Sequence, residues 1–370
     1  MRIALIILHL DPRRGGAERY TVDLAYALAG RGHAVTILAS SIANIPDVPQ
    51  PSETPQNPVS IKLHTRGMTR SAIYRSFLDS VDEHLKRNGY EIVHAMLPVR
   101  KCDVYHPHAG MAADALTRVS IFKRIQNVTN RRGVYANIET MLLEGKKPPT
   151  VIALSDTVKK SICASYPDMK EEQIATLHNA VDLKKFFPHP THLAGHTNAL
   201  MVAQDFERKG LDPTIRAMAQ LPDASFTLTV VGKQDPSDYK KLARELKMGA
   251  RVRFEGAMHD VRMFFNTADF FVLPTRHDPC SLVVLESLAM GVPVITTVCN
   301  GASELMKDGE HGYILKDPTD ASALRDAIRK MLEPHIRIKM RDACLALRPQ
   351  LSYAKHLDRL MAIYDHARSQ

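Results

Sequence analysis

Polar and charged side chains gather in the segment PTRHDPCSLVVLE, residues 274–286. Ser281 stands where an apolar helical run begins and is a candidate N-cap. The backbone amides of Cys280, Ser281 and Leu282 would then lie at a helix N-terminus, where unpaired N–H groups and the helix dipole attract anions. The segment therefore predicts a phosphate-binding turn. A capped amphipathic helix with a surface acid is the alternative.

Two carboxylates of this segment, Asp278 and Glu286, have seven residues between them. Asp278 precedes the helix and Glu286 lies about one and a half turns into it, at about 3.6 residues per turn. They cannot share one helix face, but they can accept hydrogen bonds from hydroxyl groups at different parts of one ligand.

Two adjacent cations, Arg208 and Lys209, follow a predicted strand in the second half of the chain. Arginine offers a bidentate contact and lysine a point charge, so the pair suits a diphosphate. A solvated charge pair is the alternative, although the position at a strand end favours a ligand.

Paired glycines, Gly15 and Gly16, follow the first predicted strand and open a helix. Without side chains they let backbone approach a phosphate closely at the helix N-terminus. A tight strand-to-helix turn is the alternative. The motif is not GxGxxG, so it does not indicate a dinucleotide site.

Two histidines, His106 and His108, lie in DVYHPHAG after another predicted strand of the first half. An imidazole at a strand end can act as a base or orient a sugar hydroxyl. The H-x-H spacing also suits a metal ion, but no third ligand is evident, so no metal site is predicted. A structural or exposed pair is a further alternative.

These residues must be positioned by alternating strands and helices. Apolar runs predict strands at 2–9, 34–40, 60–64, 91–96, 150–154, 198–204, 226–232, 251–256, 270–274, 292–296 and 313–315. Helical patterns lie at 17–30, from 212, and at 236–247, 259–267, 281–290, 319–332, 335–347 and 352–368. Such βα alternation is typical of α/β proteins with doubly wound parallel sheets, in which ligands bind at the carboxyl ends of the strands.

The stretch 178–197 is rich in His and Pro, lacks periodicity and is predicted to be a linker. It separates two Rossmann-like domains, 1–177 and 198–350, which are expected to face a cleft. The last helix, within 351–370, is expected to pack back on the first domain.

The composition bounds the function classes. The chain has 370 residues and a net charge of +9, which suits anionic partners. Its five cysteines are scattered without a CxxC pair, as in a reduced compartment. No apolar stretch approaches 18 residues, so a cytoplasmic protein is expected. No aromatic and basic residues interleave as in nucleic-acid-binding modules, so no nucleic-acid partner is predicted.

The stretch Leu116–Arg132 has five basic residues and no acid, with apolar residues at near-helical spacing. A basic amphipathic helix can lie on an anionic membrane surface. The alternative is a helix that packs on its own domain.

The segments GGAER, ALSDTVKK, HNAVD, RKG, VVG, FEGAMHDVRMFFNTADFFVLPT and LVVLESLAMGVPVITT occur in this order. Together they resemble the retaining glycosyltransferases of family 4, over nearly the whole chain. DVY in the first half and QDFERKGLDPTIRAMAQLP in the second most resemble the lipopolysaccharide core glucosyltransferases within that family. Those relatives have a membrane-docking region where Leu116–Arg132 stands.

The resemblance implies a GT-B fold that holds a nucleoside-diphosphate sugar mainly on the second domain. It implies that Glu286 binds the ribose and that Asp278, where the family usually has Glu, contacts the sugar hydroxyls. Arg208 and Lys209 match the family's diphosphate pair.

For the rest of the donor site, the resemblance places Gly15 and Gly16 on the phosphate side. Gly232 and the stretch Arg253–Met258 would lie near the nucleobase. A domain-one histidine would contact the sugar, and either His106 or His108 matches it, with His108 slightly favoured.

The expected reaction is transfer of a hexose, glucose by resemblance, from UDP to a hydroxyl of a cell-envelope glycan or glycolipid such as the lipopolysaccharide core. The enzyme would be a peripheral protein on the cytoplasmic face of the inner membrane. No DxD motif occurs, so no metal and no cofactor beyond the sugar nucleotide are expected. A UDP-sugar 2-epimerase of the same fold and a non-catalytic nucleotide-sugar-binding scaffold are the alternatives.

Overall fold

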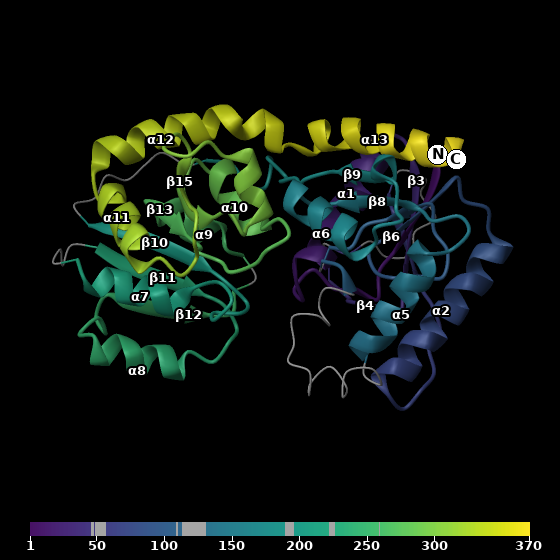
Figure 1. Ribbon diagram of the computed structural model, residues 1–370, viewed down its shortest axis with the longest axis horizontal. Coiled ribbons are helices and arrows are strands. Elements are labelled where there is room, and N and C mark those ends of the chain that lie inside the picture. The colour runs from purple at the N-terminus through teal and green to yellow at the C-terminus, as the bar shows by residue number, and fades with distance from the viewer. Residues whose placement is uncertain are drawn as a thin grey trace. The chain divides into compact units, whose positions relative to one another are not determined.

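The computed structural model describes residues 1–45, 48, 57–108, 110–112, 131–188, 196–221, 226–258 and 260–370. Contacts divide the chain into two units (Figure 1). Unit 1 comprises Met1–His178 and Tyr353–Gln370, and unit 2 comprises Asn179–Ser352. Residues 179–188, within the stretch predicted as a linker, thus belong to unit 2, and residues 189–195 lie outside the described residues.

Unit 1 is built on a parallel sheet in the order β5-β3-β1-β6-β7-β8-β9. The strands are β1 (Arg2–Ile6), β3 (Ala34–Ala39), β5 (Val59–Lys62), β6 (Ile92–Ala95), β7 (Val104–Tyr105), β8 (Thr150–Ala153) and β9 (Ile174–Thr176). The chain builds outward from β1 in one direction and then in the other, which makes the sheet doubly wound. A separate two-stranded sheet pairs β2 (His9–Leu10) with β4 (Ser41–Ile42).

Strand β1 explains why the sheet is buried on both faces. Ile3 and Leu5 pack into one apolar cluster, whereas Ala4 and Ile6 pack into another. Successive side chains of a strand point to opposite faces, so a continuous apolar run fills two cores.

Helices cover these cores. Those of unit 1 are α1 (Gly16–Gly30), α2 (Arg70–Arg87), α5 (Arg131–Leu143), α6 (Asp156–Ser165) and α13 (Tyr353–Ser369), with the 3-10 turn η1 (Glu171–Gln173). Thr69 and Ser155 cap α2 and α6 by accepting bonds from the amides of Ala72 and Val158, at 3.1 and 3.2 Å. The C-terminal α13 packs against α1, and its Leu357 and Leu360 enter the same apolar cluster as Ile3.

Unit 2 repeats the plan with the strand order β12-β11-β10-β13-β14-β15, all parallel. Its strands are β10 (Thr197–Val202), β11 (Phe226–Val231), β12 (Val252–Gly256), β13 (Phe270–Val272), β14 (Val294–Thr297) and β15 (Gly312–Leu315). The direction of winding reverses between β10 and β13, which are neighbours. This is the topological switch point at which doubly wound sheets bind ligands.

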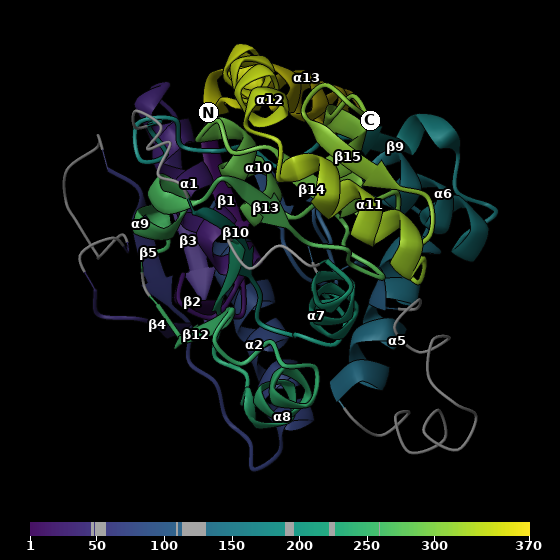
Figure 2. The same cartoon turned by 90° about the vertical axis from the view of Figure 1, so that its left-hand side faces the viewer.

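The helices of unit 2 cover both faces of its sheet. They are α7 (Leu211–Ala219), α8 (Ser237–Glu245), α9 (Arg262–Thr267), α10 (Leu282–Ala289), α11 (Ala321–Met331) and α12 (Pro334–Leu347), with turns η2 (Gly301–Leu305) and η3 (Arg348–Leu351). Helix α7 packs against α8 and α11, whereas α10 packs against α12 (Figure 2).

The predicted doubly wound α/β fold is therefore confirmed, and the predicted strands and helices have counterparts within a few residues. Apolar runs did not predict β7 or β9, because strands of two and three residues are too short for a periodic pattern. The helices α2 and α6 were not predicted either. Residues 116–130 of the basic stretch lie outside the described residues, and Arg131 and Arg132 begin α5. Among the helices that the structure describes, none is both long and apolar enough to cross a membrane.

Candidate functional site

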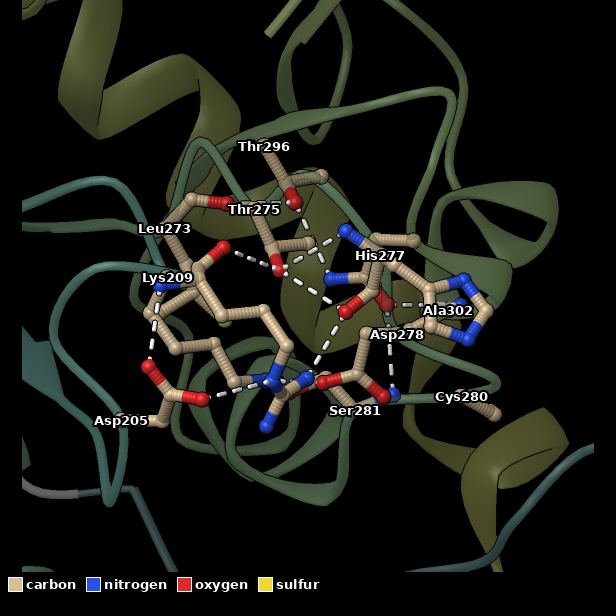
Figure 3. A network of polar contacts seen from close by, with 12 residues as sticks. Asp205, Lys209, Leu273, Thr275, His277, Asp278, Cys280, Ser281, Thr296 and Ala302 are labelled. Atoms are coloured by element: carbon tan, nitrogen blue, oxygen red, sulfur yellow. Dashed lines mark hydrogen bonds and ion pairs between the residues drawn. The ribbon is translucent and has the colours of Figure 1, made fainter. Parts of the chain in front are cut away.

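Two loops of unit 2 meet at the switch point. One follows β10 and carries Arg208 and Lys209, and the other follows β13 and carries Asp278. Because β10 and β13 pair in parallel, their carboxyl ends lie at the same edge of the sheet. Residues that are far apart in the sequence are thus brought together there (Figure 3).

The centre of this region is an ion pair between the Lys209 ammonium and the Asp278 carboxylate. The Lys209 side chain is buried and the Asp278 side chain is largely buried, with exposed fractions of 8% and 12%. Burial lowers the pKa of Lys209, and the adjacent Asp278 opposes that shift. An ammonium has three N–H donors, so this contact leaves two for a ligand.

Arg208 is held in place by its own loop and by the opposite one. Its Nε donates to Asp205 Oδ2 at 3.3 Å, and its Nη1 donates to the His277 carbonyl at 2.7 Å. The Thr275 hydroxyl lies 3.1 Å from the carbonyls of both Arg208 and His277. The Arg208 side chain is 40% exposed, so it is oriented and still open to an anion.

The start of α10 depends on a buried amide that the sequence analysis did not single out. Asn300 Oδ1 accepts bonds from the amides of Ser281 and Ala302, at 3.2 and 3.1 Å. Asn300 Nδ2 donates to the Thr296 hydroxyl at 3.0 Å. Ser281 is the N-cap residue of α10, but its side chain makes no capping bond. The expectation that the Ser281 amide is free for phosphate is therefore wrong, because Asn300 occupies it.

A second amide, Asn179, supports the same turn. Its Nδ2 donates to the Cys280 carbonyl at 2.8 Å, and its buried Oδ1 has no hydrogen-bond partner among the described residues. Burial raises the pKa of the Cys280 thiol, so this sulfur is not a thiolate. Cys280 can therefore contribute to binding through its backbone. Leu282 is half-buried and Glu286 is 6% exposed within α10.

A cavity of about 280 Å³ lies beyond the ends of β11 and β12. It is lined by Phe206, Val230, Gly232, Gln234, Pro236, Lys240, Phe254, Glu255 and Gly256. At Gly232 a Cβ atom would lie 1.9 Å from the Ala203 carbonyl, so only glycine fits. Met258, predicted near the same ligand group, is exposed and is not part of the lining.

In unit 1, Gly15 precedes α1 and Gly16 is its first residue, as the sequence predicts. Gly15 has an extended backbone and offers no capping side chain. The neighbouring Arg13 makes a bidentate pair with Asp11, at 2.7 and 2.9 Å. The turn therefore offers its backbone to an anion, while the Arg13 side chain beside it is oriented by Asp11.

The two candidate histidines belong to a buried aromatic cluster of unit 1. His106 is fully buried, and its Nδ1 lies 3.2 Å from His94 Nε2. His108 is half-buried, and the centroid of its ring lies 4.2 Å from that of His106 and 4.1 Å from that of Tyr20. The Nε2 atoms of both His106 and His108 are buried without a hydrogen-bond partner among the described residues.

Burial sets the charge of this cluster. It lowers the pKa of His94 to about 3 and that of His356, a residue of α13, to about 4. It also holds the pKa values of His106 and His108 well below 6.5. These imidazoles are neutral near pH 7, so they suit hydrogen bonding better than proton abstraction. No group of three His, Cys, Asp or Glu in the described part of the chain is placed to hold a metal ion.

Two Rossmann-like units, each built on a parallel sheet, are the architecture of the GT-B fold. The Glycosyltransferase Family 4 model matches residues 14–185, and the model for glycosyl transferases group 1 matches residues 186–344. The chain belongs to the glycosyltransferases that these two models together describe.

Individual relatives agree. The lipopolysaccharide glucosyltransferase WaaG of Escherichia coli (strain K12) is 28% identical, over 86% of this chain and 86% of its own length. The crystal structure of WaaG, a glycosyltransferase involved in lipopolysaccharide biosynthesis, superposes with a TM-score of 0.79 at 23% identity, covering 96% of this chain and 98% of that chain. Anabaena Alr3699/HepE in complex with UDP-glucose gives 0.74 at 18% identity and covers all of both chains.

The buried histidines predict acid sensitivity. Their folded-state pKa values lie below 6.5, so the unfolded chain binds more protons as the pH falls below 6.5, and the folded state loses stability. The loss is on the order of 1 kcal/mol per buried histidine for each pH unit, down to the folded-state pKa. Urea unfolding followed by circular dichroism between pH 7 and 5 measures it. His94→Gln is expected to flatten the dependence, while the exposed His366→Gln leaves it as in the wild type. Equal stability at pH 7 and 5 contradicts the expectation.

Proposed function

We propose that this glycosyltransferase moves a hexose, namely glucose, from UDP to a hydroxyl of a lipopolysaccharide-core-type glycolipid. The configuration at the sugar C1 is retained in the proposed reaction. The similarity to a lipopolysaccharide glucosyltransferase supports the acceptor class. A relative in fold that is solved with UDP-glucose supports the donor. No cofactor or metal is proposed beyond the sugar nucleotide.

The observation that carries the proposal is the buried Lys209–Asp278 pair at the switch point. When the bond between the sugar C1 and the diphosphate breaks, negative charge develops on the leaving oxygen. A preorganised ammonium in a buried site stabilises that charge more strongly than water does. Arg208, oriented by Asp205 and the His277 carbonyl, supplies a second cation for the other phosphate.

Asp278 gains a role in this mechanism that its position in the sequence does not reveal. Burial alone would favour the neutral amine of Lys209, and the adjacent carboxylate favours the ammonium. The proposal is that Asp278 holds Lys209 charged with one oxygen and contacts a sugar hydroxyl with the other. In the retaining step the acceptor oxygen bonds to C1 on the face that the diphosphate leaves, and the leaving phosphate oxygen accepts the acceptor proton.

The remaining donor groups are assigned along the same unit. The cavity at Gly232 is proposed to hold the uracil, because Phe206 and Phe254 line it and bases stack on aromatic rings. Glu286, buried in α10, is proposed to accept the ribose hydroxyls. The backbone at Cys280 and Leu282 faces the phosphates in this scheme, while the Ser281 amide is held by Asn300.

For unit 1 by itself, Gly15 and Gly16 are proposed to bind a phosphate, and one imidazole is proposed to bind a sugar hydroxyl. His108 is half-buried, whereas His106 is fully buried. This difference favours His108 for the first contact with the sugar, and the unpaired Nε2 of His106 lies in the ring beside it.

The first test concerns the reaction and Lys209. Incubation with UDP-glucose is expected to release UDP slowly even without acceptor. Inversion of the sugar at C2 would instead indicate an epimerase, and binding without turnover would indicate a non-catalytic scaffold.

Lys209→Met is expected to lower kcat about 100-fold or more, because it removes a donor to the developing charge. Arg216→Ala, an exposed ion-pair residue of α7, is the control and should keep wild-type turnover. Unchanged turnover in a folded Lys209→Met protein rejects the assignment.

The second test concerns the nucleobase. Phe254→Ala is expected to weaken UDP binding about tenfold, because base stacking on an aromatic ring contributes about 1–3 kcal/mol. Calorimetry with UDP and with inorganic diphosphate measures it, and diphosphate binding should not change. Phe187→Ala, which truncates an exposed phenylalanine of the same unit, is the matched control. Equal affinities for UDP in wild type and Phe254→Ala would place the base elsewhere.

The third test concerns the membrane. The basic stretch Leu116–Arg132 is proposed to bring the enzyme to an anionic surface on the cytoplasmic face of the inner membrane, where a glycolipid acceptor resides. Pelleting with vesicles that contain anionic phospholipid is expected at low salt and should weaken as salt rises. Neutral vesicles are the control. If anionic vesicles do not pellet the protein at low salt, the membrane proposal is wrong.

A further inference from the structure

A chain of polar contacts runs through the core of unit 1 from the C-terminal helix to the end of β7. Tyr364 Oη, on α13, lies 2.7 Å from His94 Nδ1, on β6. His94 Nε2 lies 3.2 Å from His106 Nδ1. All three side chains are fully buried, so water does not compete for these contacts.

The direction of the hydrogen bonds follows from counting donors and acceptors. If the Tyr364 hydroxyl donates to His94 Nδ1, neutral His94 carries its proton on Nε2 and donates to His106 Nδ1. His106 then carries its own proton on Nε2. In the opposite direction His94 would donate to Tyr364, and the buried hydroxyl hydrogen would need another acceptor. No further partner of Tyr364 occurs among the described residues. The first direction leaves one buried group without a partner, His106 Nε2–H, whereas the opposite direction leaves two, the Tyr364 hydroxyl hydrogen and the Nε2 acceptor of His106. Each unpaired buried group costs about 1–3 kcal/mol, so the first direction is favoured.

The far end of the chain is unsatisfied. His106 Nε2 is buried without a hydrogen-bond partner in the described part of unit 1, and so is His108 Nε2. The two rings are neighbours, with centroids 4.2 Å apart. Buried polar atoms are nearly always paired in native proteins, so two adjacent unpaired nitrogens indicate a place for a polar ligand group.

Helix α13 supports the same cluster at a second point. His356 Nδ1 donates to the His178 carbonyl at 2.9 Å, which leaves Nε2 of the neutral ring as an acceptor. The Tyr20 hydroxyl, 2.8 Å away, donates to that nitrogen. The ring of Tyr20 in turn packs on His108. Both candidate histidines are therefore held through residues of α13.

We propose that Tyr364 and His94 are positioning residues that hold His106 as its Nε2–H tautomer, a fixed hydrogen-bond donor beside His108. The ligand group that this donor serves is an oxygen acceptor, either a hydroxyl or the ring oxygen of the donor sugar. Only the identity of that ligand rests on the proposed function. The tautomer and its dependence on Tyr364 follow from unit 1 alone.

The first experiment reads the tautomer directly. Nitrogen-15 NMR of the full chain with labelled histidine distinguishes protonated from unprotonated ring nitrogens, and His106→Gln assigns the signal. His106 is expected to carry its proton on Nε2 in the wild type. In Tyr364→Phe, which removes only the hydroxyl, the signal should shift toward a mixture of tautomers. A proton on Nδ1 in the wild type overturns the proposal, and this measurement needs no folded Tyr364 variant.

The matched control lies on the same helix. Tyr353 packs on Tyr20 and His356 rather than on His94, so Tyr353→Phe should leave the His106 tautomer unchanged. An unchanged tautomer in Tyr364→Phe, or the same shift in both variants, also overturns the proposal.

The second experiment measures function. Loss of a partner that orients a metal-ligating histidine costs about 10–100-fold in activity, and by analogy kcat of Tyr364→Phe with UDP-glucose should fall on the order of tenfold. Its affinity for UDP alone should match the wild type, and Tyr353→Phe should retain wild-type kcat. Equal losses of UDP affinity and turnover would indicate a general structural defect and count against positioning. If the wild type turns over no sugar nucleotide, the proposed function fails while the tautomer result stands.

Discussion

The candidate donor site depends on one constraint, the burial of a lysine at the switch point of a parallel sheet. A buried ammonium is costly unless it is paired, and Asp278 provides the pairing for Lys209. The pair is maintained because parallel β10 and β13 bring their carboxyl ends to the same edge of the sheet. Loss of either charge would leave the other buried and uncompensated, so the two loops are fixed together before any ligand arrives.

Neutral hydrogen-bonding groups around this pair hold the backbone. Asn300 ties the start of α10 to the loop after β14, and Thr275 ties the loop after β13 to Arg208. Asn179 holds the Cys280 carbonyl. Each of these contacts satisfies a backbone group that a loop would otherwise leave to water. The candidate site is thus made of loops that buried amides and hydroxyls orient, which is the preorganisation that electrostatic catalysis requires.

Unit 1 follows a different rule, because its candidate site contains neutral imidazoles rather than ions. Burial keeps His94 and His106 uncharged, so their geometry depends on which nitrogen carries the proton. The hydrogen bond from Tyr364, on α13, sets the tautomer of His94, and the hydrogen bond from His94 sets the tautomer of His106. The C-terminal helix therefore contributes both apolar packing and polar order to unit 1.

The sequence by itself determined the class of fold and most of its elements, because the periods of helices and buried strands are local properties of a few consecutive residues. It also singled out Lys209, Asp278 and both histidines, since charged or ionisable groups after apolar strands are visible in one dimension. It did not reveal that Asn300 occupies the Ser281 amide or that Asn179 binds the Cys280 carbonyl, because amide side chains in loops carry no periodic signal.

Only the tertiary structure decided which of these groups are partners. Lys209 and Asp278 are 69 residues apart, and His94 and Tyr364 are 270 apart. Such contacts depend on strand order and on the return of the chain to unit 1, and both are set by the packing of whole elements. The sequence therefore identified the charged groups and predicted an open phosphate-binding turn. The packing decided that Lys209 and Asp278 form an ion pair and that Asn300 accepts a hydrogen bond from the Ser281 amide.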